Sequence, residues 1–204
     1  MSDLWVRPTG YKPPFPPADT EVIRGELNGV KRLLEFGPGD STQAFLDLGV
    51  EHITTCEHID KWFEVAKERF ANDPRVRVLK FTDEFPVTVE GLGDETFDLA
   101  FVDTPQGYAA MRKKHPGYED CSRLNTCLFA VERAPVVLLH DAYRCLERAS
   151  LGRLSAMGHK YRFLNSEYGM ARIEGRPKNE SVSMGNSRSQ KRKLKRPTSL
   201  NAAL

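Results

Sequence analysis

Several acidic residues in this chain stand where short apolar runs end, which is where the strands of an α/β sheet would end. Four acids close such a run or follow it directly: Glu57, Asp83, Asp103 and Asp141. In a doubly wound sheet the carboxyl ends of the strands meet at one edge, and ligands bind outside that edge. Carboxylates gathered there are costly unless a ligand, a cation or hydrogen bonds satisfy them. The pattern predicts an active site at this edge, whereas each acid taken alone could be a helix cap or a solvated strand end.

A glycine turn follows the first apolar run. Residues 32–36, RLLEF, fit a short buried strand that breaks at residues 37–39, Gly-Pro-Gly. Glycine permits φ > 0 and lets a ligand approach the backbone with no Cβ in the way. Residues 40–42, Asp-Ser-Thr, can cap a helix that closes at Gly49. Strand, glycine turn and capped helix form the nucleotide-binding half of a Rossmann unit, although similar turns also occur without a ligand.

The residues around the turn indicate which nucleotide it would bind. Thr42 stands where a dinucleotide fingerprint has its third glycine, and Asp40 would repel a pyrophosphate. Glu35, two residues before the first glycine, suits a ligand with a cationic end, such as S-adenosylmethionine with its sulfonium and ammonium groups. Glu57 lies about 20 residues beyond the turn, where an acid commonly bonds the ribose hydroxyls. We expect these residues to bind the cofactor: Glu35, Gly37, Gly39, Asp40, Ser41, Glu57, Asp83 and Asp103.

Strand and helix patterns alternate along the body of the chain. Strands are predicted at 32–36, 52–59, 75–81, 97–103 and 134–141, and helices at 20–29, 41–49, 61–73, 119–133 and 142–158. Two short strands at 159–166 and 168–174, joined by a tight turn, predict a terminal antiparallel hairpin. The order predicts a Rossmann-like, doubly wound mixed sheet, mostly parallel. The apolar stripe of the 61–73 helix is expected to face the core; it contains Trp62, Phe63, Val65, Ala66 and Phe70.

Composition divides the chain of 204 residues into three parts. Residues 1–30 form a proline-rich arm, whose aromatic residues we expect to pack on the body, and a short helix. Residues 31–174 form the domain. Residues 175–204 carry eight basic residues and one acid, a charge of +7, which against +2 overall leaves −5 for residues 1–174. The basic tail predicts either phosphate contacts with nucleic acid or a disordered solubilising end.

The cysteines and the hydropathy indicate the compartment. The chain has no C-x-x-C pair and no disulfide-dense spacing, which predicts reduced thiols at Cys56, Cys121, Cys127 and Cys145. No stretch approaches the roughly 18 apolar residues of a membrane span, and the first residues do not resemble a signal peptide. We expect a cytoplasmic protein with no membrane partner, and the sequence leaves its oligomeric state open.

Several segments together resemble a known family. The segments RLLEFGPGDST, TTCEHI and FDLAFVD resemble class I S-adenosylmethionine-dependent methyltransferases over residues 31–174. The second half is similar to the plant glucuronoxylan 4-O-methyltransferase family, which acts in polysaccharide biosynthesis. The matching positions are Asp103, Pro105, Gly107, Tyr108, Pro116, Gly117, His140, Asp141, Arg144 and Glu147. The resemblance implies a Rossmann-like fold, S-adenosylmethionine as cofactor and a sugar or other small hydroxyl acceptor. The first half departs from that family and keeps the general Glu-x-Gly-x-Gly form.

A hydroxyl acceptor needs a base or a metal to take its proton as the new bond forms. Asp103, His140 and Asp141 are the catalytic candidates. Two acids at adjacent strand ends also resemble the divalent-metal site of small-molecule O-methyltransferases, but Ala142 stands where that class has an Asn, so a metal is doubtful.

The acceptor is assigned to a loop of about 15 residues, 104–118, because loops of that length are usually functional or mobile. The predicted substrate-binding residues are Tyr108, Arg112, Lys113 and Arg144, whose cations suit an anionic acceptor. Two other functions remain open: an RNA-binding or RNA-modifying protein that uses the basic tail, and a non-catalytic interaction module.

Overall fold

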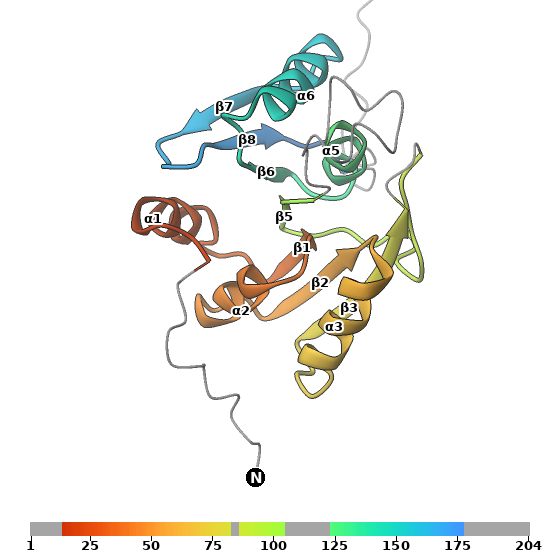
Figure 1. The fold of residues 1–204 in the computed structure, drawn as a ribbon. Coiled ribbons are helices and arrows are strands. Elements are labelled where there is room, and N and C mark those ends of the chain that lie inside the picture. Colours follow the sequence, from red (N-terminus) through yellow and green to blue (C-terminus); the bar gives the residue numbers. More distant parts are fainter. Residues whose placement is uncertain (1–13, 83–85, 105–122, 178–204) are drawn as a thin grey trace, which may run out of the picture.

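The computed structural model describes residues 14–82, 86–104 and 123–177, which form one eight-stranded sheet covered by helices (Figure 1). The strands are β1 (Arg32–Phe36), β2 (His52–Glu57), β3 (Val76–Thr82), β4 (Thr88–Val89), β5 (Leu99–Val102), β6 (Val136–His140), β7 (Tyr161–Leu164) and β8 (Met170–Glu174). The helices are α1 (Pro17–Glu26), α2 (Asp40–Asp47), α3 (Asp60–Phe70), α5 (Leu124–Val131) and α6 (Cys145–Ala156). None of these helices combines the length and the apolar composition needed to cross a bilayer.

The strand order is β4-β3-β2-β1-β5-β6-β8-β7. Strands β3, β2, β1, β5 and β6 run parallel, while β8 and β7 form an antiparallel hairpin at one edge and β4 an antiparallel edge strand at the other. The predicted fold class is confirmed. The chain winds outward from β1 in one direction and from β5 in the other, so the strand order reverses between them. Ligands bind at the carboxyl ends of strands beside such a reversal.

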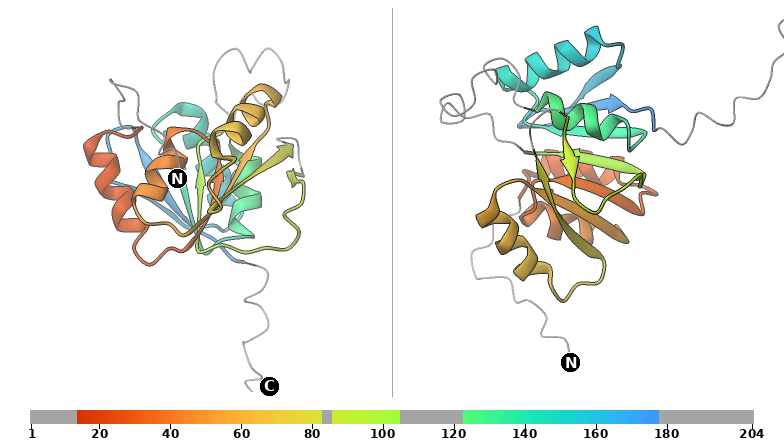
Figure 2. Two further views of the ribbon diagram at one scale, coloured as in Figure 1. Left: turned by 90° about the horizontal axis from the view of Figure 1, so that it is seen from below. Right: turned by 90° about the vertical axis from the view of Figure 1, so that its right-hand side faces the viewer.

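The two faces of the sheet are covered by different helices (Figure 2). Alternate residues of β1 point to opposite faces, so Leu33 packs with α1 and α2, whereas Leu34 and Phe36 pack with α5 and α6. The ring of Phe36 meets Phe81 edge-on, with the centroids 5.2 Å apart. Full burial of one such side chain stabilises the fold by about 1.5–3 kcal/mol, and these contacts fix where β1 ends.

Several boundaries differ from the sequence-based expectations. Helix α1 begins at Pro17, three residues earlier than predicted, because proline suits the first turn of a helix. Asp19, the residue just before the predicted start at 20, lies inside the first turn and is fully buried. The N-cap of α2 is Gly39 and not one of residues 40–42. Strand β4 was not predicted, since two residues are too few for a periodic pattern.

Some expectations fall partly outside the described residues. Phe15 of the proline-rich arm is buried against the body, and Cys56, Cys127 and Cys145 carry free thiols. Cys121, the loop 105–118 and the first residues of the predicted 119–133 helix lie outside the described part of the chain.

The packed part of the chain continues past the end of β8. The backbone N–H of Gly175 donates to the carbonyl of Pro135 at 2.9 Å, and that of Arg176 donates to Val131 at 2.6 Å. Pro177 is buried. A Cβ on Gly175 would lie 1.8 Å from the carbonyl oxygen of Ala134, so only glycine fits there.

Truncations after Pro177 and after Glu174 should therefore differ in stability. Removing residues 178–204 should leave the melting temperature unchanged, because that segment lacks the apolar content to fold. Removing residues 175–204 should lower it by about 4–8 °C, since two backbone hydrogen bonds of about 1 kcal/mol each are lost. Differential scanning calorimetry on both truncations tests this, and equal melting temperatures would contradict it.

Candidate functional site

A cavity of about 470 Å³ opens at the carboxyl ends of β1, β2 and β5, where the strand order reverses. Its walls come from four parts of the chain: the glycine turn (residues 37–41), the end of β2 with the start of α3 (57–59 and Trp62), residues 103–104, and residues 14–15. Ligand pockets commonly enclose about 300–1,000 Å³, so the cavity is large enough for a small-molecule cofactor.

The two glycines of the turn have different roles. Gly37 has φ 102°, and a Cβ there would lie 3.2 Å from the Cβ of Thr104, so both its conformation and its space require glycine. Gly39 has φ 178°, an extended conformation that any residue adopts. The expectation of φ > 0 is wrong for Gly39. No described atom lies within 4 Å of its Cβ position, so the missing side chain leaves open space at the cavity wall.

Glu35 lies beneath the turn and does not line the cavity. Its Oε1 accepts a hydrogen bond from Ser41 Oγ and its Oε2 accepts one from Thr42 Oγ1, both at 2.6 Å. Thr42 Oγ1 in turn accepts from the backbone N–H of Gly39 at 3.1 Å. Burial raises the pKa of Glu35 to about 7, although these hydrogen bonds act in the opposite direction. Glu35 is not part of the cavity lining, and its hydrogen bonds join β1 to the first turn of α2.

Three of the predicted acids do reach the cavity wall: Asp40, Glu57 and Asp103. Asp83 lies outside the described residues. Asp40 is held by Arg69 of α3, whose Nη2 lies 2.7 Å from its Oδ1. Among the described residues, no Lys or Arg belongs to the cavity lining. The cavity therefore favours a cationic group over a phosphate.

Glu57 is fixed by the backbone that follows it. Its Oε1 accepts hydrogen bonds from the backbone N–H groups of His58 at 2.7 Å and Ile59 at 2.8 Å. The side chain is almost fully buried and still forms part of the cavity wall. These bonds hold the carboxylate at the end of β2, as a residue that recognises hydroxyl groups requires.

Apolar side chains complete the wall beside Glu57. Ile59 is 43% exposed and Trp62 is 50% exposed, and both line the cavity. The prediction that the whole stripe of α3 faces the core is wrong, because only Ala66 and Phe70 are buried. Helical spacing identified one face of α3, but it did not show that the neighbouring elements cover only part of that face.

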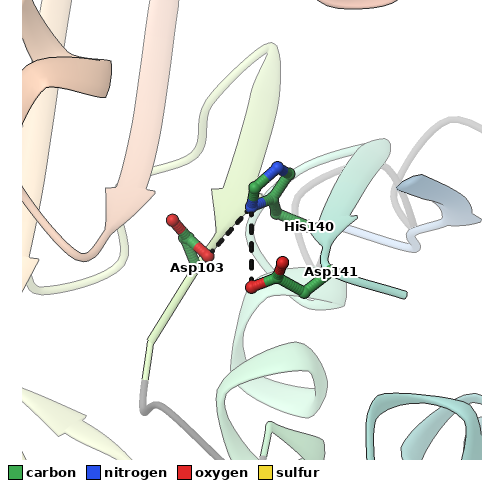
Figure 3. A group of neighbouring side chains, drawn as sticks. All are labelled: Asp103, His140 and Asp141. Atoms are coloured by element: carbon green, nitrogen blue, oxygen red, sulfur yellow. Dashed lines mark hydrogen bonds and ion pairs between the residues drawn. The ribbon is translucent and has the colours of Figure 1, made fainter. Parts of the chain in front are cut away.

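Asp103, His140 and Asp141 come together behind the cavity (Figure 3). His140 Nδ1 lies 3.1 Å from Asp103 Oδ1 and 3.8 Å from Asp141 Oδ2. Of the three, only Asp103 lines the cavity. The sequence-based expectation that two strand ends bring these groups together agrees with the structure.

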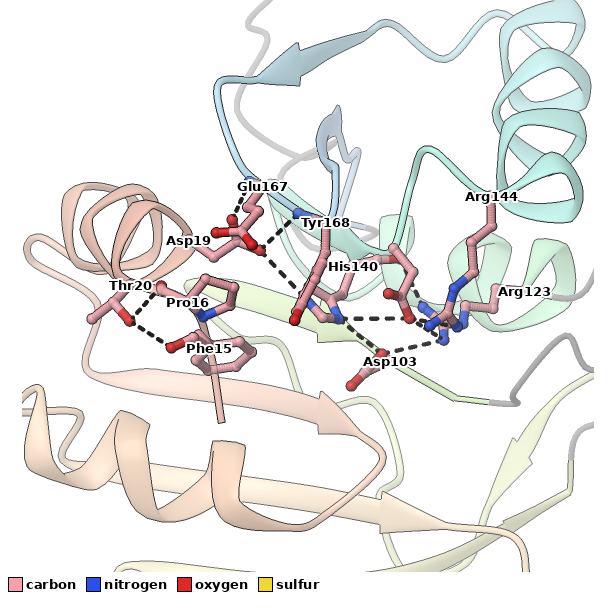
Figure 4. Close-up of polar contacts among 11 residues, drawn as sticks. Phe15, Pro16, Asp19, Thr20, Asp103, Arg123, His140, Arg144, Glu167 and Tyr168 are labelled. Atoms are coloured by element: carbon pink, nitrogen blue, oxygen red, sulfur yellow. Dashed lines mark hydrogen bonds and ion pairs between the residues drawn. The ribbon is translucent and has the colours of Figure 1, made fainter. Parts of the chain in front are cut away.

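A buried arginine that sequence reasoning missed holds this group together (Figure 4). Arg123, the N-cap of α5, is fully buried. Its Nη1 donates to the carbonyl oxygen of His140 at 2.7 Å, and its Nη2 lies 3.2 Å from Asp103 Oδ1 and 3.3 Å from Asp141 Oδ2. Its Nε lies 3.6 Å from Glu147 Oε1. In the sequence the only signal is a basic residue just before an apolar helix, which equally fits a solvated position.

Asp141 has an unusual backbone conformation. Its φ is 55°, a left-handed value that Asp tolerates better than most residues. The next peptide is anchored because the N–H of Ala142 donates to the carbonyl of Gly169 at 2.9 Å. Arg144, predicted to bind substrate, lies with its Nη1 2.7 Å from Asp141 Oδ2. The other predicted substrate residues, Tyr108, Arg112 and Lys113, lie outside the described part of the chain.

The charged groups around His140 and Asp103 shift the pKa values of these two residues. Burial alone would lower the pKa of His140, but the hydrogen bond to Asp103 and the charges of Asp103 and Asp141 raise it above its ordinary value. Burial would raise the pKa of Asp103, yet the hydrogen bond from His140 and the charge of Arg123 hold it below its ordinary value. Both shifts favour the charged forms, an aspartate beside an imidazolium.

The same three residues could in principle ligate a divalent metal. Their three ligand atoms lie within 4.8 Å of one another. However, the two carboxylate oxygens concerned are both within 3.3 Å of Arg123 Nη2, so a guanidinium already lies between them. A metal also requires a neutral histidine, whereas the surrounding acids favour protonated His140. The residues as arranged do not fit a metal.

Replacing Glu35 by Gln should change the pH dependence of stability. The folded-state pKa is raised from 4.5 to about 7, so the stabilisation is fully present below pH 4.5 and lost as pH rises through about 7. The loss is on the order of 3 kcal/mol. Urea unfolding between about pH 4 and 8 should show this decrease in the wild type and not in Glu35→Gln. The exposed Glu51→Gln control should keep it, and an unchanged decrease in Glu35→Gln would disprove the assignment.

Replacing Arg123 by Met should lower the free energy of unfolding by about 3–5 kcal/mol, because Asp103, Asp141 and Glu147 lose their buried cation. Arg148→Met, at an exposed position of α6, should change it by no more than about 0.5 kcal/mol. Chemical denaturation measures both.

Mg²⁺ or Mn²⁺ should leave the melting temperature of the wild type unchanged, and a rise with either ion would show that the carboxylates accept a metal.

Comparisons with known proteins bear on the fold. No protein-family model matches the sequence, and no curated protein matches it. The chain is similar to a putative caffeoyl-CoA O-methyltransferase from Staphylococcus aureus, with 18% identity and a TM-score of 0.53 over 78% of this chain and 83% of that one. It is also similar to a putative RNA methyltransferase from Pyrococcus horikoshii, with 12% identity and a TM-score of 0.52 over 77% and 80% of the two chains.

A third similar structure is the N-terminal domain of EvdMO1 with SAH bound. It has 15% identity and a TM-score of 0.52 over 79% of this chain and 82% of that one. Two of these structural neighbours are described as putative methyltransferases and the third has SAH bound, and the likeness shows that the chain shares their Rossmann-like α/β fold.

Proposed function

We propose that this chain is an S-adenosylmethionine-dependent methyltransferase whose cofactor lies in the cavity above the glycine turn. The observation that carries the proposal is the lining of the cavity, in which three carboxylates and, among the described residues, no Lys or Arg face the space. Arg69 and Arg123 pair with Asp40 and Asp103 from outside that lining. A pyrophosphate would be repelled there, whereas a sulfonium and an ammonium group would be attracted. The EvdMO1 domain of the same fold, with SAH bound, supports this choice of cofactor.

Each part of the wall suits one part of that cofactor. We assign the ribose hydroxyls to the Glu57 carboxylate, which the backbone holds at the end of β2. The adenine ring is assigned to the exposed apolar surfaces of Ile59 and Trp62. The cationic end of the cofactor faces Asp40 or Asp103. Glu35 contributes indirectly, because it holds the helix turn that carries the backbone of the site.

For the acceptor we propose a sugar or another small hydroxyl compound. In the transfer, the C–S bond breaks with its electron pair remaining on sulfur while the new C–O bond forms, and the hydroxyl proton leaves. Asp103 is the group on the cavity wall that we assign to accept that proton, while His140 and Arg123 hold its carboxylate from behind and Asp141 lies beside His140. The fold likeness to a putative caffeoyl-CoA O-methyltransferase supports O-methylation.

The proposed acceptor residues include some outside the described part of the chain. Tyr108, Arg112 and Lys113 remain proposals from the sequence. Arg144 is already paired with Asp141, so we propose that it positions that carboxylate next to the acceptor. The basic tail and the fold likeness to a putative RNA methyltransferase keep RNA as a second acceptor class, to which an acidic cavity is less suited.

Replacing Gly39 by Val tests the cofactor site directly. The side chain would enter open space at the cavity wall, so cofactor binding should be lost while the melting temperature stays near that of the wild type. Isothermal titration with S-adenosylmethionine and with its demethylated product measures binding. Gly152→Val is a matched control, because Gly152 also has open space at its Cβ position but lies on α6.

Binding to the wild type and to Gly39→Val decides the cofactor assignment, and a transfer assay decides the acceptor class. If neither compound binds to it, or if Gly39→Val binds both as well as the wild type does, the cofactor assignment is wrong. A screen of sugars, phenols and RNA with methyl-labelled cofactor then identifies the acceptor class. Binding without transfer to any acceptor would favour the non-catalytic alternative.

A further inference from the structure

Asp19 is a buried carboxylate that the proposed chemistry does not use. It lies in the first turn of α1 and is fully buried. Its Oδ1 accepts a hydrogen bond from the backbone N–H of Glu167, and its Oδ2 accepts a longer one, at 3.4 Å, from Tyr168 (Figure 4). Both donors belong to the turn between β7 and β8. Asp19 therefore ties the N-terminal helix to the far edge of the sheet.

The same carboxylate faces the histidine of the proposed site. Asp19 Oδ2 lies 3.7 Å from His140 Nε2, on the opposite side of the ring from Asp103. His140 Nε2 is buried and makes no hydrogen bond with the described residues. Within the described part of the chain, the ion pairs of Asp19 are with His140 alone. A buried carboxylate is costly without a cation, so this contact favours the protonated ring.

All other charged or titratable groups that face His140 can be named from the elements around it. Asp103 follows β5, and Asp141 follows β6. Arg123 at the start of α5 donates to the carbonyl oxygen of His140, and the ring of Tyr168 lies edge-on with its centroid 6.4 Å away. Arg123 serves Asp103 and Asp141, and it is not among the ion pairs of Asp19. The two ring nitrogens of His140 thus face carboxylates from opposite ends of the site.

Asp19 also belongs to the segment that forms one wall of the cavity. Pro14 and Phe15 line the cavity, and the Phe15 ring lies edge-on to His140 with the centroids 5.5 Å apart. Thr20 Oγ1 donates to the carbonyl of Pro16 at 3.0 Å, and the N–H of Thr20 donates to the same carbonyl at 2.9 Å. Residues 15–20 therefore form one unit, which Asp19 anchors on one side and which presents Phe15 to the cavity on the other.

We propose that Asp19 and protonated His140 form a latch that holds residues 14–20 against the cavity, so that the wall is complete only while the His140 ring carries its second proton. Asp19 is a positioning residue in this scheme, because it acts through the segment and touches no ligand. Deprotonation of His140 leaves Asp19 buried without a cation and loosens the segment. The ligand-binding consequence rests on the proposed function, whereas the latch itself does not.

The size of the effect that protonation of His140 has on docking of the segment follows from thermodynamic linkage. A contact that raises the pKa of His140 by about one unit makes docking of the segment about tenfold more favourable when the ring is protonated. Asp103 and Asp141 already raise the pKa of His140, so the stabilisation from the protonated ring is fully present below pH 6.5 and lost as pH rises through the folded-state value. If only the docked form binds ligand, the apparent Kd increases by the inverse of the docked fraction.

Asp19→Asn tests the latch without a ligand, since it keeps a hydrogen-bond acceptor for the turn and removes the charge. NMR titration of the His140 ring should show its pKa lowered by about one unit in this variant. Glu21→Gln is the matched control, because Glu21 is an exposed acid on the same helix, and it should leave the titration unchanged. A direct reading of the ring is needed because Glu35 titrates near pH 7 and would contribute to any global pH profile.

A double-mutant cycle with His140→Gln separates a latch from a purely structural role. The stability cost of Asp19→Asn should decrease as pH rises in the wild-type background and should be independent of pH when residue 140 is Gln. An unshifted His140 titration in Asp19→Asn, or a stability cost that is the same at all pH values in both backgrounds, would overturn the latch.

The effect of the latch on ligand binding is measured with S-adenosylhomocysteine as the probe. From about pH 6 to 9 its Kd should rise more in Glu35→Gln than in the Glu35→Gln/Asp19→Asn double variant, by up to about tenfold when the segment is mostly undocked at the higher pH. An equal rise in both would overturn the coupling of latch to cavity. No binding to any variant would refute the proposed function, while the NMR titration would still decide the latch.

Discussion

The site depends on one buried guanidinium. Arg123 contacts the carboxylates of Asp103, Asp141 and Glu147 and the carbonyl of His140, so it fixes the ends of β5 and β6 relative to α5 and α6. Buried ion pairs often add little net stability, because desolvation offsets the attraction, but removing one partner is strongly destabilising. Arg123 therefore contributes by fixing the positions of these groups and not by adding net stability. It places a positive charge between two acids that lie at the ends of β5 and β6.

Two carboxylates on neighbouring strands show how the environment decides a role. Glu35 on β1 is buried among hydroxyl groups, and its pKa rises to about 7. Asp103, just after β5, is surrounded by Arg123 and His140, and its pKa falls. Glu35 is suited to hold the glycine turn in a neutral or hydrogen-bonded form, whereas Asp103 keeps its negative charge to a lower pH than an ordinary aspartate does. The sequence alone presents both simply as acids at the ends of apolar runs.

Local patterns were sufficient to predict every strand except β4 and to predict the turn, since period-two alternation and Gly37 depend on nearby residues. They also placed Asp103 and Asp141 at one edge, because parallel strands share that edge. The roles of Arg123 and Asp19 were not predictable in this way, since each depends on partners that lie far away in the chain. The stripe of α3 was misassigned for the same reason: helical periodicity gives a face, but the surrounding elements determine which residues of it are covered, and Trp62 remained at the cavity.

The residues that meet at His140 come from positions 19, 103, 123 and 141, so the site assembles only after distant segments have docked. Loop-closure entropy must be overcome before such contacts contribute. A ligand that binds only the assembled cavity therefore stabilises the whole domain, by an amount that grows with the logarithm of its concentration above Kd. Phe15 and Asp19 hold the wall segment itself, while Ile23 and Leu27 of α1 pack in the same core and Glu26 pairs with Arg172. Protonation of His140 therefore acts on the contact nearest the cavity, and α1 keeps the segment close to the body.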